Sequence, residues 1–403
     1  MPTIADIRAA RERIAGTLPV TPCRQALGYG NLVPARLFLK LENLQRTGSF
    51  KERGALNRLL TMEEASRRRG VITASAGNHA QALALHASNL GIASTVVMPE
   101  NTPLIKVTNT RRYGATVVLH GATFDDAVDH AHQLRKERDL VLVPAFNDEA
   151  VIAGQGTVAL ELAEQIDRID TMVVPIGGGG LISGIALALK ELMPDIRVVG
   201  VEAEAAPSAH ASREAGEIVT VTSRDTIADG IAVKRVGELT FPLIERLVDD
   251  LVKVDDAEIA TAILRLLENQ KTLTEGAGAA GMAAILAGKV PMVEGETVAV
   301  VLCGGNIDIN ILARIIDRGL VSDGRVARLK VRGQDRPGLL AEVTATVAEH
   351  GANVLEITHA REFADISVGE VEVLLTLETR GENHIAEIIG ALVDEGDRVQ
   401  SLS

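Results

Sequence analysis

Short β-rich runs alternate with amphipathic segments of helical spacing between about Val71 and Glu202, and this alternation restricts the possible folds more than any other feature. Strands separated by helices need crossover connections, which bring the strands into a mostly parallel, twisted sheet with helices on both faces. The sequence therefore predicts an α/β fold. The predicted strands are Val71–Thr73, Ser94–Met98, Thr116–Leu119, Leu140–Val143, Met172–Pro175 and Val198–Val201, and the predicted helices lie near 79–89, 103–112, 124–138, 151–166 and 181–191.

A second α/β stretch follows, and the composition then changes near residue 320. The elements predicted in that stretch are helices at 257–269 and near 276–287, a strand at Thr297–Leu302 and a helix from Asp308. The residues from Gly319 to Gly324 are typical of a linker. We expect three parts: a first region at 1–319 that contains a smaller α/β subdomain at roughly 52–153, a linker at 320–325, and a second domain at 326–403.

The last part of the chain has the element order β-α-β-β-α-β. Apolar Ala327, Leu329 and Val331 alternate with basic residues, which is the pattern of a half-buried strand. The elements predicted after it are a turn at 335–338, a helix at 339–350, strands at 353–359 and 371–377, a helix at 384–395 and a strand at 398–402. This order predicts a ferredoxin-like unit that forms a separate small domain.

The composition is that of a globular protein and argues against several classes of function. The 403 residues are 46% hydrophobic and carry a net charge of −13, which disfavours binding to a nucleic-acid backbone. Charged residues near the N-terminus and the lack of a long apolar run argue against a signal peptide and a membrane span. The two cysteines form no disulfide framework and lack metal-ligand spacing. We expect a reduced, cytoplasmic protein.

A lysine at the start of a predicted helix is the first candidate for chemistry. The stretch Ser49-Phe50-Lys51-Glu52-Arg53-Gly54-Ala55 precedes apolar residues at helical spacing, so Lys51 lies in the first turn, with Thr47 or Ser49 as cap. The helix dipole disfavours a cation there by ~0.3–1 kcal/mol, which favours a neutral amine that acts as nucleophile or base. Taken alone, the stretch is more typical of a solvent-exposed lysine. The assignment therefore depends on the rest of the chain.

Four consecutive glycines follow a predicted buried strand in the run Val173-Val174-Pro175-Ile176-Gly177-Gly178-Gly179-Gly180-Leu181. The backbone N–H groups of such a turn converge at the start of the next helix and bind an anion without lysine or arginine. Each hydrogen bond to a charged group contributes ~1.5–3 kcal/mol, so the turn suits a phosphate. The spacing matches neither the dinucleotide motif nor the P-loop, which argues against NAD and ATP and for a small monophosphorylated ligand.

Two further glycine-containing turns follow predicted strands. The turn Thr73-Ala74-Ser75-Ala76-Gly77-Asn78-His79-Ala80-Gln81 offers N–H groups and the Ser75 hydroxyl to a carboxylate, and Asn78 offers an amide to a ring hydroxyl. Ser75 or Asn78 also suits a helix cap, which is compatible with this role, and His79 is more typical of a capping or surface histidine than of a base. The turn Val300-Val301-Leu302-Cys303-Gly304-Gly305-Asn306 places Cys303 at a strand end, where its thiol either packs in the core or faces an acceptor nitrogen.

A nucleophilic lysine, a phosphate-binding turn and a carboxylate-binding turn together suggest pyridoxal phosphate and an amino-acid substrate. The chain resembles the threonine/serine dehydratase family, which belongs to the tryptophan-synthase-β-like class of pyridoxal-phosphate enzymes. The motifs that carry the resemblance occur in the family's order over residues from about 15 to 318, and they are Ser49–Ala55, Ala74–Gln81, Ala153-Gly154-Gln155-Gly156-Thr157, Gly177–Leu181 and Cys303–Asn306. The resemblance implies two open, twisted α/β sheets.

The tail of the chain, with Asp335-Arg336-Pro337-Gly338-Leu339-Leu340, resembles an ACT domain, a module that commonly senses amino acids. A catalytic region followed by one ACT domain resembles the shorter, catabolic-type members of the family. The resemblance implies a homodimer or homotetramer with an amino-acid substrate. We expect the ACT domain to bind a small apolar amino acid, such as isoleucine or valine, near Leu339, Leu340 and Asn353, or else to serve in dimerisation without a ligand.

The resemblance also implies a role for each site residue. Lys51 bonds covalently to the cofactor aldehyde, Asn78 partners the ring oxygen, and Cys303 falls where the family has serine or cysteine facing the pyridine nitrogen. The implied cofactor-binding residues are Phe50, Lys51, Asn78, Gly177, Gly178, Gly179, Gly180, Leu181 and Cys303. The residues implied around the substrate carboxylate are Ser75, Ala76, Asn78 and His79.

A cation site beyond the phosphate loop is a further implication of the resemblance. Glu202 and Ala206 match the family's pattern, whereas Ser208 stands where the magnesium-binding serine racemases have aspartate. We therefore expect a monovalent ion such as K⁺, held by Glu202 and by the carbonyls of Ala206, Ile231 and Val233.

The implied activity is the conversion of L-threonine to 2-oxobutanoate and ammonia, with Lys51 taking the α-proton and L-serine as a further substrate. An unperturbed thiol pKa of ~8.5 leaves Cys303 mostly neutral, so it does not hold a pyridine nitrogen protonated, and loss of the β-hydroxyl is favoured over transamination. L-serine dehydratase, threo-3-hydroxyaspartate dehydratase and serine racemase remain alternatives, because the choice at the β-carbon involves only ~1–3 kcal/mol. A non-catalytic amino-acid sensor is the alternative from a different class, and a nucleotide-dependent oxidoreductase is weaker for want of the dinucleotide spacing.

Overall fold

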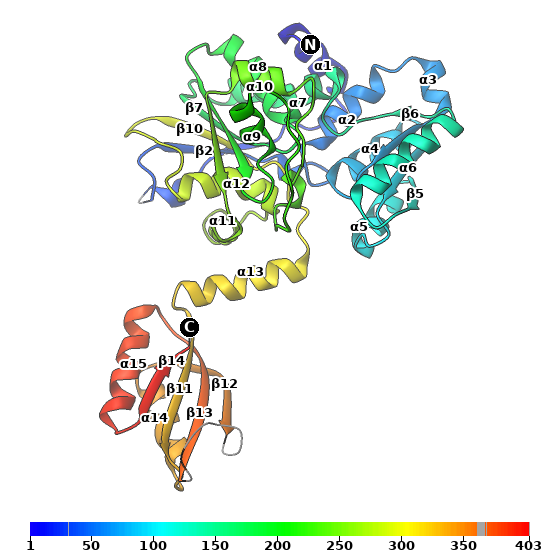
Figure 1. The fold of residues 1–403 in the computed structure, drawn as a ribbon. Helices are drawn as coiled ribbons and strands as arrows, with labels where there is room; N and C mark the ends of the chain where they lie inside the picture. Colours follow the sequence, from blue (N-terminus) through cyan, green and yellow to red (C-terminus); the bar gives the residue numbers. More distant parts are fainter. Residues whose placement is uncertain (31, 361–366, 368, 403) are drawn as a thin grey trace. The chain divides into compact units, whose positions relative to one another are not determined.

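Mostly parallel sheets and an antiparallel sheet belong to different parts of the chain. The computed structural model describes residues 1–30, 32–360, 367 and 369–402, and its contacts divide the chain into a first unit, Met1–Asp308, and a second unit, Ile309–Ser403 (Figure 1). The first unit contains two sheets and the second unit contains one. No helix within the described residues is long and apolar enough to cross a bilayer.

The larger sheet of the first unit has the strand order β1-β2-β10-β7-β8-β9. Its strands are β1 (Cys23–Gln25), β2 (Arg36–Lys40), β7 (Thr171–Pro175), β8 (Arg197–Ala203), β9 (Asp250–Val254) and β10 (Thr297–Val301). The β1–β2 pair is antiparallel and every other pair is parallel. The central strands β7 and β10 are buried along their whole length, as expected for strands covered on both faces.

Helices cover both faces of this sheet, with α8 on one face and α12 on the other (Figure 1). The helices around the larger sheet are α1 (Ile4–Ile14), α7 (Glu149–Gln165), α8 (Gly180–Leu192), α9 (Ser208–Ala215), α10 (Phe241–Leu247), α11 (Asp256–Gln270) and α12 (Gly276–Leu286). Three short 3₁₀ turns accompany them, at η1 (Leu27–Tyr29), η2 (Glu42–Leu44) and η3 (Asp229–Ile231).

The smaller sheet of the first unit has the order β5-β4-β3-β6 and is entirely parallel. Its strands are β3 (Val71–Ala74), β4 (Ser94–Met98), β5 (Thr116–Leu119) and β6 (Val141–Leu142). The helices in this part of the chain are α2 (Lys51–Leu60), α3 (Glu64–Arg69), α4 (Asn78–Asn89), α5 (Leu104–Arg112) and α6 (Phe124–Glu137). The predicted α/β fold with two open sheets is thereby confirmed.

Glycines allow α7 to pack closely against α2 and α8. A Cβ atom at Gly154 in α7 would lie 2.6 Å from the carbonyl oxygen of Arg53 in α2. A Cβ atom at Gly184 in α8 would lie 2.4 Å from the carbonyl oxygen of Ile152 in α7. Backbone atoms in a close-packed interior do not give way to such contacts, so these positions require glycine. The glycines of α7 thus hold α2, which begins with Lys51, at a fixed distance.

The second unit is a ferredoxin-like domain preceded by one helix, as predicted. Its elements are α13 (Ile309–Ser322), β11 (Val326–Gln334), α14 (Leu339–Glu349), β12 (Asn353–Ala360), β13 (Glu370–Glu378), α15 (Glu382–Asp394) and β14 (Arg398–Ser401). The strands form an antiparallel sheet with the order β12-β13-β11-β14. Ala327, Leu329 and Val331 are buried in its core, as their alternation indicated.

Helix α13 extends further than the glycine at position 319 suggested. Residues 320–322, which we expected in the linker, are its last residues, and the helix predicted from Asp308 begins at Ile309. A glycine inside a helix costs only ~1 kcal/mol relative to alanine. Apolar residues at helical spacing on either side of Gly319 therefore outweigh it.

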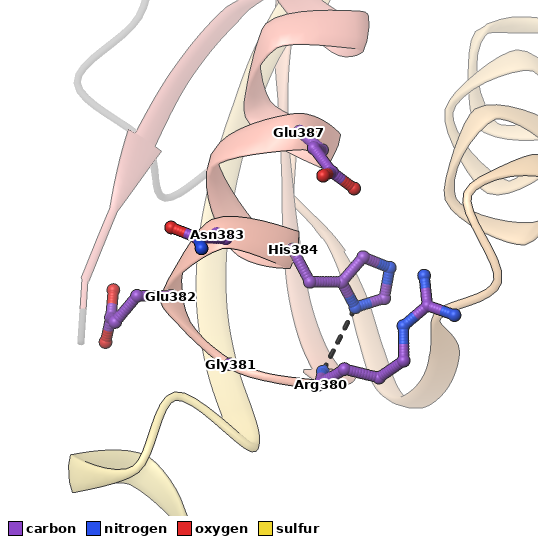
Figure 2. A pocket seen from close by; sticks show the side chains of 6 residues that line it. All are labelled: Arg380, Gly381, Glu382, Asn383, His384 and Glu387. Carbon is purple, nitrogen blue, oxygen red and sulfur yellow. Dashed lines mark hydrogen bonds between the residues drawn. The ribbon is translucent and has the colours of Figure 1, made fainter.

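A hollow lies at the start of α15 in the second unit (Figure 2). His384 occupies its inner side, where its Nδ1 accepts the N–H of Arg380 at 3.0 Å and its Nε2 donates to the carbonyl of His350 at 2.7 Å. The residues that line the hollow are Arg380, Gly381, Glu382, Asn383, His384 and Glu387. Because both ring nitrogens of His384 are engaged, this side chain is a structural link between α15 and the end of α14.

Candidate active site

Lys51 is the first residue of α2, as predicted, and its half-buried side chain points into the first unit. Its Nζ donates a hydrogen bond to the carbonyl oxygen of Ala145 at 3.0 Å and lies 4.9 Å from the centre of the Phe50 ring. Burial lowers the pKa of this amine to about 8, and the negative charge of Cys303 and Glu275 would only partly oppose that effect. An amine with this pKa is partly neutral near pH 8 and can act as a nucleophile or a base.

The predicted cap of this helix is wrong. The residue before Lys51 is Phe50, and neither Thr47 nor Ser49 accepts a hydrogen bond from the first turn. Ser49 instead pairs with Gly304 in an isolated β-bridge, which fixes its backbone to the turn after β10. The Glu52 carboxylate reaches back and accepts the N–H of Thr47 at 2.5 Å. A tertiary contact has therefore displaced the local cap.

The four glycines form the turn between β7 and α8. None of the N–H groups of residues 177–181 has an acceptor within the described part of the chain, so all five remain free for an anion. Gly179 has a φ of 90°, and a Cβ atom at Gly178 would lie 2.3 Å from the Phe146 ring. Glycine is required at both positions. The turn thus fits the phosphate of the predicted cofactor.

Ala145 and Phe146, in the loop after β6, connect Lys51 to the glycine turn. Ala145 accepts the hydrogen bond from Lys51, and the ring of the adjacent Phe146 packs on Gly178. A Cβ atom at Gly180 would lie 2.9 Å from Cβ of Phe146. The amine and the anion-binding turn therefore flank one dipeptide. Our sequence analysis missed both residues because they belong to none of the motifs that it singled out.

Asn78 has a fixed amide orientation. Its Nδ2 donates to Oε1 of Glu275 at 2.6 Å, and its Oδ1 accepts from Nδ2 of Asn306 at 2.7 Å. Asn306 also donates to the carbonyl of Thr47 at 2.6 Å. These contacts join the loop before Lys51, the Asn78 turn and the Cys303 turn, and thereby connect the two sheets of the first unit.

The turn before α4 leaves backbone donors free. Neither Ser75 nor Asn78 caps α4, whose N-cap residue is Gly77, because the Ser75 hydroxyl accepts the N–H of Gly77 at 3.3 Å. The N–H groups of Ala76, Asn78 and His79 have no acceptor among the residues that the structure describes. These three donors and the Ser75 hydroxyl proton remain free for a carboxylate.

The imidazole of His79 does not take part in this turn. Its Nε2 donates to the carbonyl of Val143 at 3.0 Å. Burial, together with the nearby charge of Lys51, lowers the pKa of His79 to about 4. The ring is therefore neutral at physiological pH. His79 offers its backbone N–H, and not a charged side chain, to a ligand.

Cys303 and Glu275 are two buried acids beside the amine. Burial raises the pKa of the Cys303 thiol far above its usual range, and Glu275 adds to the effect, so the thiol is neutral. Burial also raises the pKa of Glu275 to about 7, with a further contribution from Asp229, while the hydrogen bond from Asn78 opposes the rise. Glu275 was not among the site residues predicted from the sequence. The signal available was a glutamate directly before the glycine-rich start of α12.

Glu202 lies in β8, at a buried position. Its two carboxylate oxygens accept the N–H groups of Ala209 at 2.7 Å and His210 at 2.8 Å in the first turn of α9. Burial raises the pKa of Glu202 to about 7, although both hydrogen bonds oppose the rise. The carboxylate thus serves as a cap for α9.

Of the other residues of the predicted cation site, Ala206 and Val233 lie in loops and Ile231 ends the 3₁₀ turn η3. The carbonyls of Ala206 and Ile231 accept the N–H groups of Ser208 at 2.9 Å and Val233 at 2.8 Å. The backbone of Ile231 and the Val233 side chain lie beside Gly177, next to the anion-binding turn. Within the described ranges, no group of three or more His, Cys, Asp or Glu residues is suited to a metal. The cation site stays a prediction.

The residues predicted to bind an effector lie at two element starts of the second unit. Leu339 is a core residue at the start of α14, whereas its neighbour Leu340 is 38% exposed. Asn353 is the exposed first residue of β12, and its amide donates to Glu378 at 3.4 Å. Leu340 and Asn353 are therefore accessible, while Leu339 is largely covered.

A buried amine beside a glycine turn, on a fold of two α/β sheets, defines a pyridoxal-phosphate enzyme. Residues 14–304 match the family of pyridoxal-phosphate dependent enzymes, and residues 327–394 match the ACT domain. The L-threonine ammonia-lyase of Thermotoga maritima is 46% identical over 404 residues, with 99% of both chains covered. That of Geobacter sulfurreducens is 50% identical over 396 residues, with 98% of both chains covered.

Solved structures agree with this match. The structure of maize serine racemase superposes with a TM-score of 0.75 at 38% identity, covering 80% of this chain and 98% of that chain. The chain therefore belongs to the family of pyridoxal-phosphate dependent enzymes and carries an ACT domain after the catalytic part. The tryptophan-synthase-β-like fold and the cofactor that the sequence predicted are thereby confirmed.

Replacing Glu275 with glutamine should change how stability depends on pH. Since an exposed glutamate has a pKa of ~4.3 and burial raises that of Glu275 to about 7, the unfolded chain loses this proton at lower pH than the folded chain. Glu275 therefore costs the folded state stability as the pH rises through this window. Glutamine has no such proton and can still accept from Asn78.

We expect the melting temperature of Glu275→Gln, relative to the unsubstituted protein, to rise by roughly 2–6 °C between pH 5 and pH 8. Calorimetric scans without added cofactor measure this difference. Glu204→Gln, at an exposed position of the same unit, is the control. A melting-temperature difference that does not change with pH would contradict the raised pKa of Glu275.

Proposed function

We propose that this protein is an L-threonine ammonia-lyase, which converts L-threonine to 2-oxobutanoate and ammonia. The observation that carries the proposal is the amine of Lys51, which donates to the carbonyl of Ala145 next to the Phe146 ring that packs on the glycine turn. Burial lowers the pKa of this amine to about 8. Two relatives of the same length, both L-threonine ammonia-lyases, support the choice of substrate.

The chain's own residues supply a base for the α-proton and backbone donors for the phosphate and the substrate carboxylate. When bound, pyridoxal phosphate supplies an aldehyde that reacts with amines and a ring that withdraws electrons from the α-carbon. Lys51 Nζ, partly neutral near pH 8, takes the α-proton of the substrate. The free N–H groups of residues 177–181 bind the phosphate, and those of Ala76, Asn78 and His79 bind the substrate carboxylate.

Two side chains set the polarity around the ring. The Asn78 amide, held by Glu275 and Asn306, partners the ring oxygen. Cys303 stays a neutral thiol because it is buried, so it places no negative charge opposite the ring nitrogen. A site without a carboxylate at this position favours loss of the β-hydroxyl over transamination.

We propose further that residues 1–319 form the catalytic region and residues 326–403 the regulatory domain of a cytoplasmic homodimer or homotetramer. A monovalent cation would be held by Glu202 and by the carbonyls of Ala206, Ile231 and Val233. The proximity of Ile231 and Val233 to Gly177 supports a link between such an ion and the phosphate turn.

Serine racemase is the second candidate, because the structure resembles that of maize serine racemase. L-serine dehydratase and threo-3-hydroxyaspartate dehydratase would use the same lysine and the same glycine turn. The β-carbon substituents that distinguish these substrates differ by ~1–3 kcal/mol of binding at most, so kinetics must decide.

Initial rates should rank the substrates. We expect kcat/KM to be highest for L-threonine, lower for L-serine and lowest for threo-3-hydroxyaspartate, measured by release of the 2-oxo acid at saturating pyridoxal phosphate. Lys51→Ala should lose turnover, while Lys136→Ala, an exposed lysine on α6, should retain it. A preference for serine or hydroxyaspartate, or D-serine as the main product from L-serine, would contradict the proposed activity.

An amino acid should bind the second unit. We expect isothermal titration of the full-length protein to detect isoleucine or valine, and Asn353→Ala to weaken that binding by roughly 10-fold because it removes a polar contact at the start of β12. Asn383→Ala, in the hollow of Figure 2, is the matched control. Loss of amino-acid binding in Asn383→Ala alone would indicate that the amino acid binds in the hollow. If no amino acid gives a titration signal, only a role in dimerisation is left for the second unit.

A further inference from the structure

The three residues that follow Lys51 are each tied to a different neighbour. Glu52 accepts the N–H of Thr47 at 2.5 Å and a hydrogen bond from His86 of α4 at 3.0 Å. The N–H of Gly54 donates to the side chain of Gln155 in α7 at 3.1 Å. Arg53, between them, makes the most contacts. The first turn of α2 is therefore held from several sides, whereas the side chain of Lys51 makes a single hydrogen bond to the residues that the structure describes.

Arg53 is fully buried and uses all parts of its guanidinium group. Its Nε and Nη2 donate to the two oxygens of Glu42 at 2.8 Å each. Its Nη1 and Nη2 donate to the two oxygens of Glu161 in α7 at 2.6 and 2.9 Å. Nη1 also donates to Oγ1 of Thr157 at 3.1 Å. Two bidentate carboxylate pairs fix both the position and the plane of this group.

Lys40 completes a closed cluster of four charges. Its Nζ donates to Glu161 at 2.6 Å, to the carbonyl of Thr21 at 2.7 Å and to Gln165 at 2.9 Å. Two cations and two carboxylates thus balance each other. Buried charges are tolerated only when they are paired and hydrogen-bonded, so a shift of Arg53 would leave Glu42 without its ion-pair partner and Glu161 with Lys40 alone.

The direction of the two side chains matters for the lysine. Residues two apart on an α-helix point about 200° apart around the axis, so Arg53 and Lys51 extend from opposite sides of the same turn. Arg53 extends toward Glu42 and Glu161, and Lys51 extends toward Ala145. The charge cluster therefore holds the side of the first turn of α2 that is opposite the amine of Lys51.

We propose that Arg53 is a positioning residue for Lys51, and that its two carboxylate partners, Glu42 and Glu161, set the place and rotation of the first turn of α2. The mechanism does not use any of these three charges. The inference rests on the proposed function only in that Lys51 binds the cofactor.

The test compares two substitutions near Lys51 with a matched one at the far end of α2. Arg53→Lys keeps the charge but loses the two-pronged geometry. Thr157→Val keeps the shape but removes the hydrogen bond that Thr157 accepts from Arg53 and the one that it donates to the carbonyl of Gly154 at 2.7 Å. Arg58→Lys is the control, since Arg58 lies 2.9 Å from Asp148, the N-cap residue of α7, and thus joins the same two helices.

The readouts separate positioning from folding. At saturating pyridoxal phosphate we expect Arg53→Lys to lower kcat on threonine by about 10-fold or more, because small displacements of a reacting group cost that much. KM should change less than kcat. The pH midpoint of the visible absorbance of the bound cofactor should shift as the amine leaves its buried place. Thr157→Val should lower kcat by about 3-fold. It should shift the pH midpoint of the absorbance in the same direction as Arg53→Lys, but by less.

Arg58→Lys should leave kcat and the absorbance midpoint unchanged, although its melting temperature falls. The proposal is overturned if Arg53→Lys and Thr157→Val lower only the melting temperature. If Arg53→Lys does not fold, Thr157→Val decides. A protein whose absorbance shifts as expected but that does not deaminate threonine would contradict the proposed function and leave this inference intact, because the absorbance requires only the cofactor.

Discussion

A closed cluster of buried charges determines where the reactive amine lies. Lys40 in β2, Glu42 in η2, Arg53 in α2 and Glu161 in α7 form ion pairs that exclude water almost completely. Glu42 has a lowered pKa, because the charge and hydrogen bonds of Arg53 outweigh the rise that burial alone would cause. All four groups are therefore held in one arrangement. Lys51 starts the same helix as Arg53, on the opposite side of its first turn, and burial lowers the pKa of its amine to about 8.

The turns that follow the parallel strands supply the rest of the candidate site. Strands β7 and β10 are parallel neighbours in the larger sheet, so the turns that follow them lie at the same edge. The turn after β3, from the smaller sheet, is joined to the turn after β10 by the hydrogen bond between Asn78 and Asn306. Five N–H groups of the glycine turn lack an acceptor within the described part of the chain, so the turn is suited to bind an anion through its backbone.

Local patterns made much of this predictable, and long-range contacts explain what was missed. Each β-rich run and the run of four glycines is a pattern of neighbouring residues. The sheets, the glycine turn and the position of Lys51 in the first turn of a helix could therefore be predicted from the sequence. Arg53 and Glu161, by contrast, are 108 residues apart, and Asn78 and Glu275 are 197 apart. No spacing rule connects them. The cap predicted for α2 failed for the same reason, since the Ser49 backbone pairs with Gly304. The cap predicted for α4 failed for a local reason, since the Ser75 hydroxyl accepts the N–H of Gly77 within its own turn.

Chemical trapping of the cofactor tests the central claim most directly. Borohydride reduces the bond between pyridoxal phosphate and a lysine to a stable amine, which peptide mass spectrometry can locate. The structure predicts a pyridoxyl group on the peptide that contains Lys51 and on no other lysine. A modification confined to another lysine, or none in protein that carries the cofactor's visible absorbance, would contradict the assignment of the site.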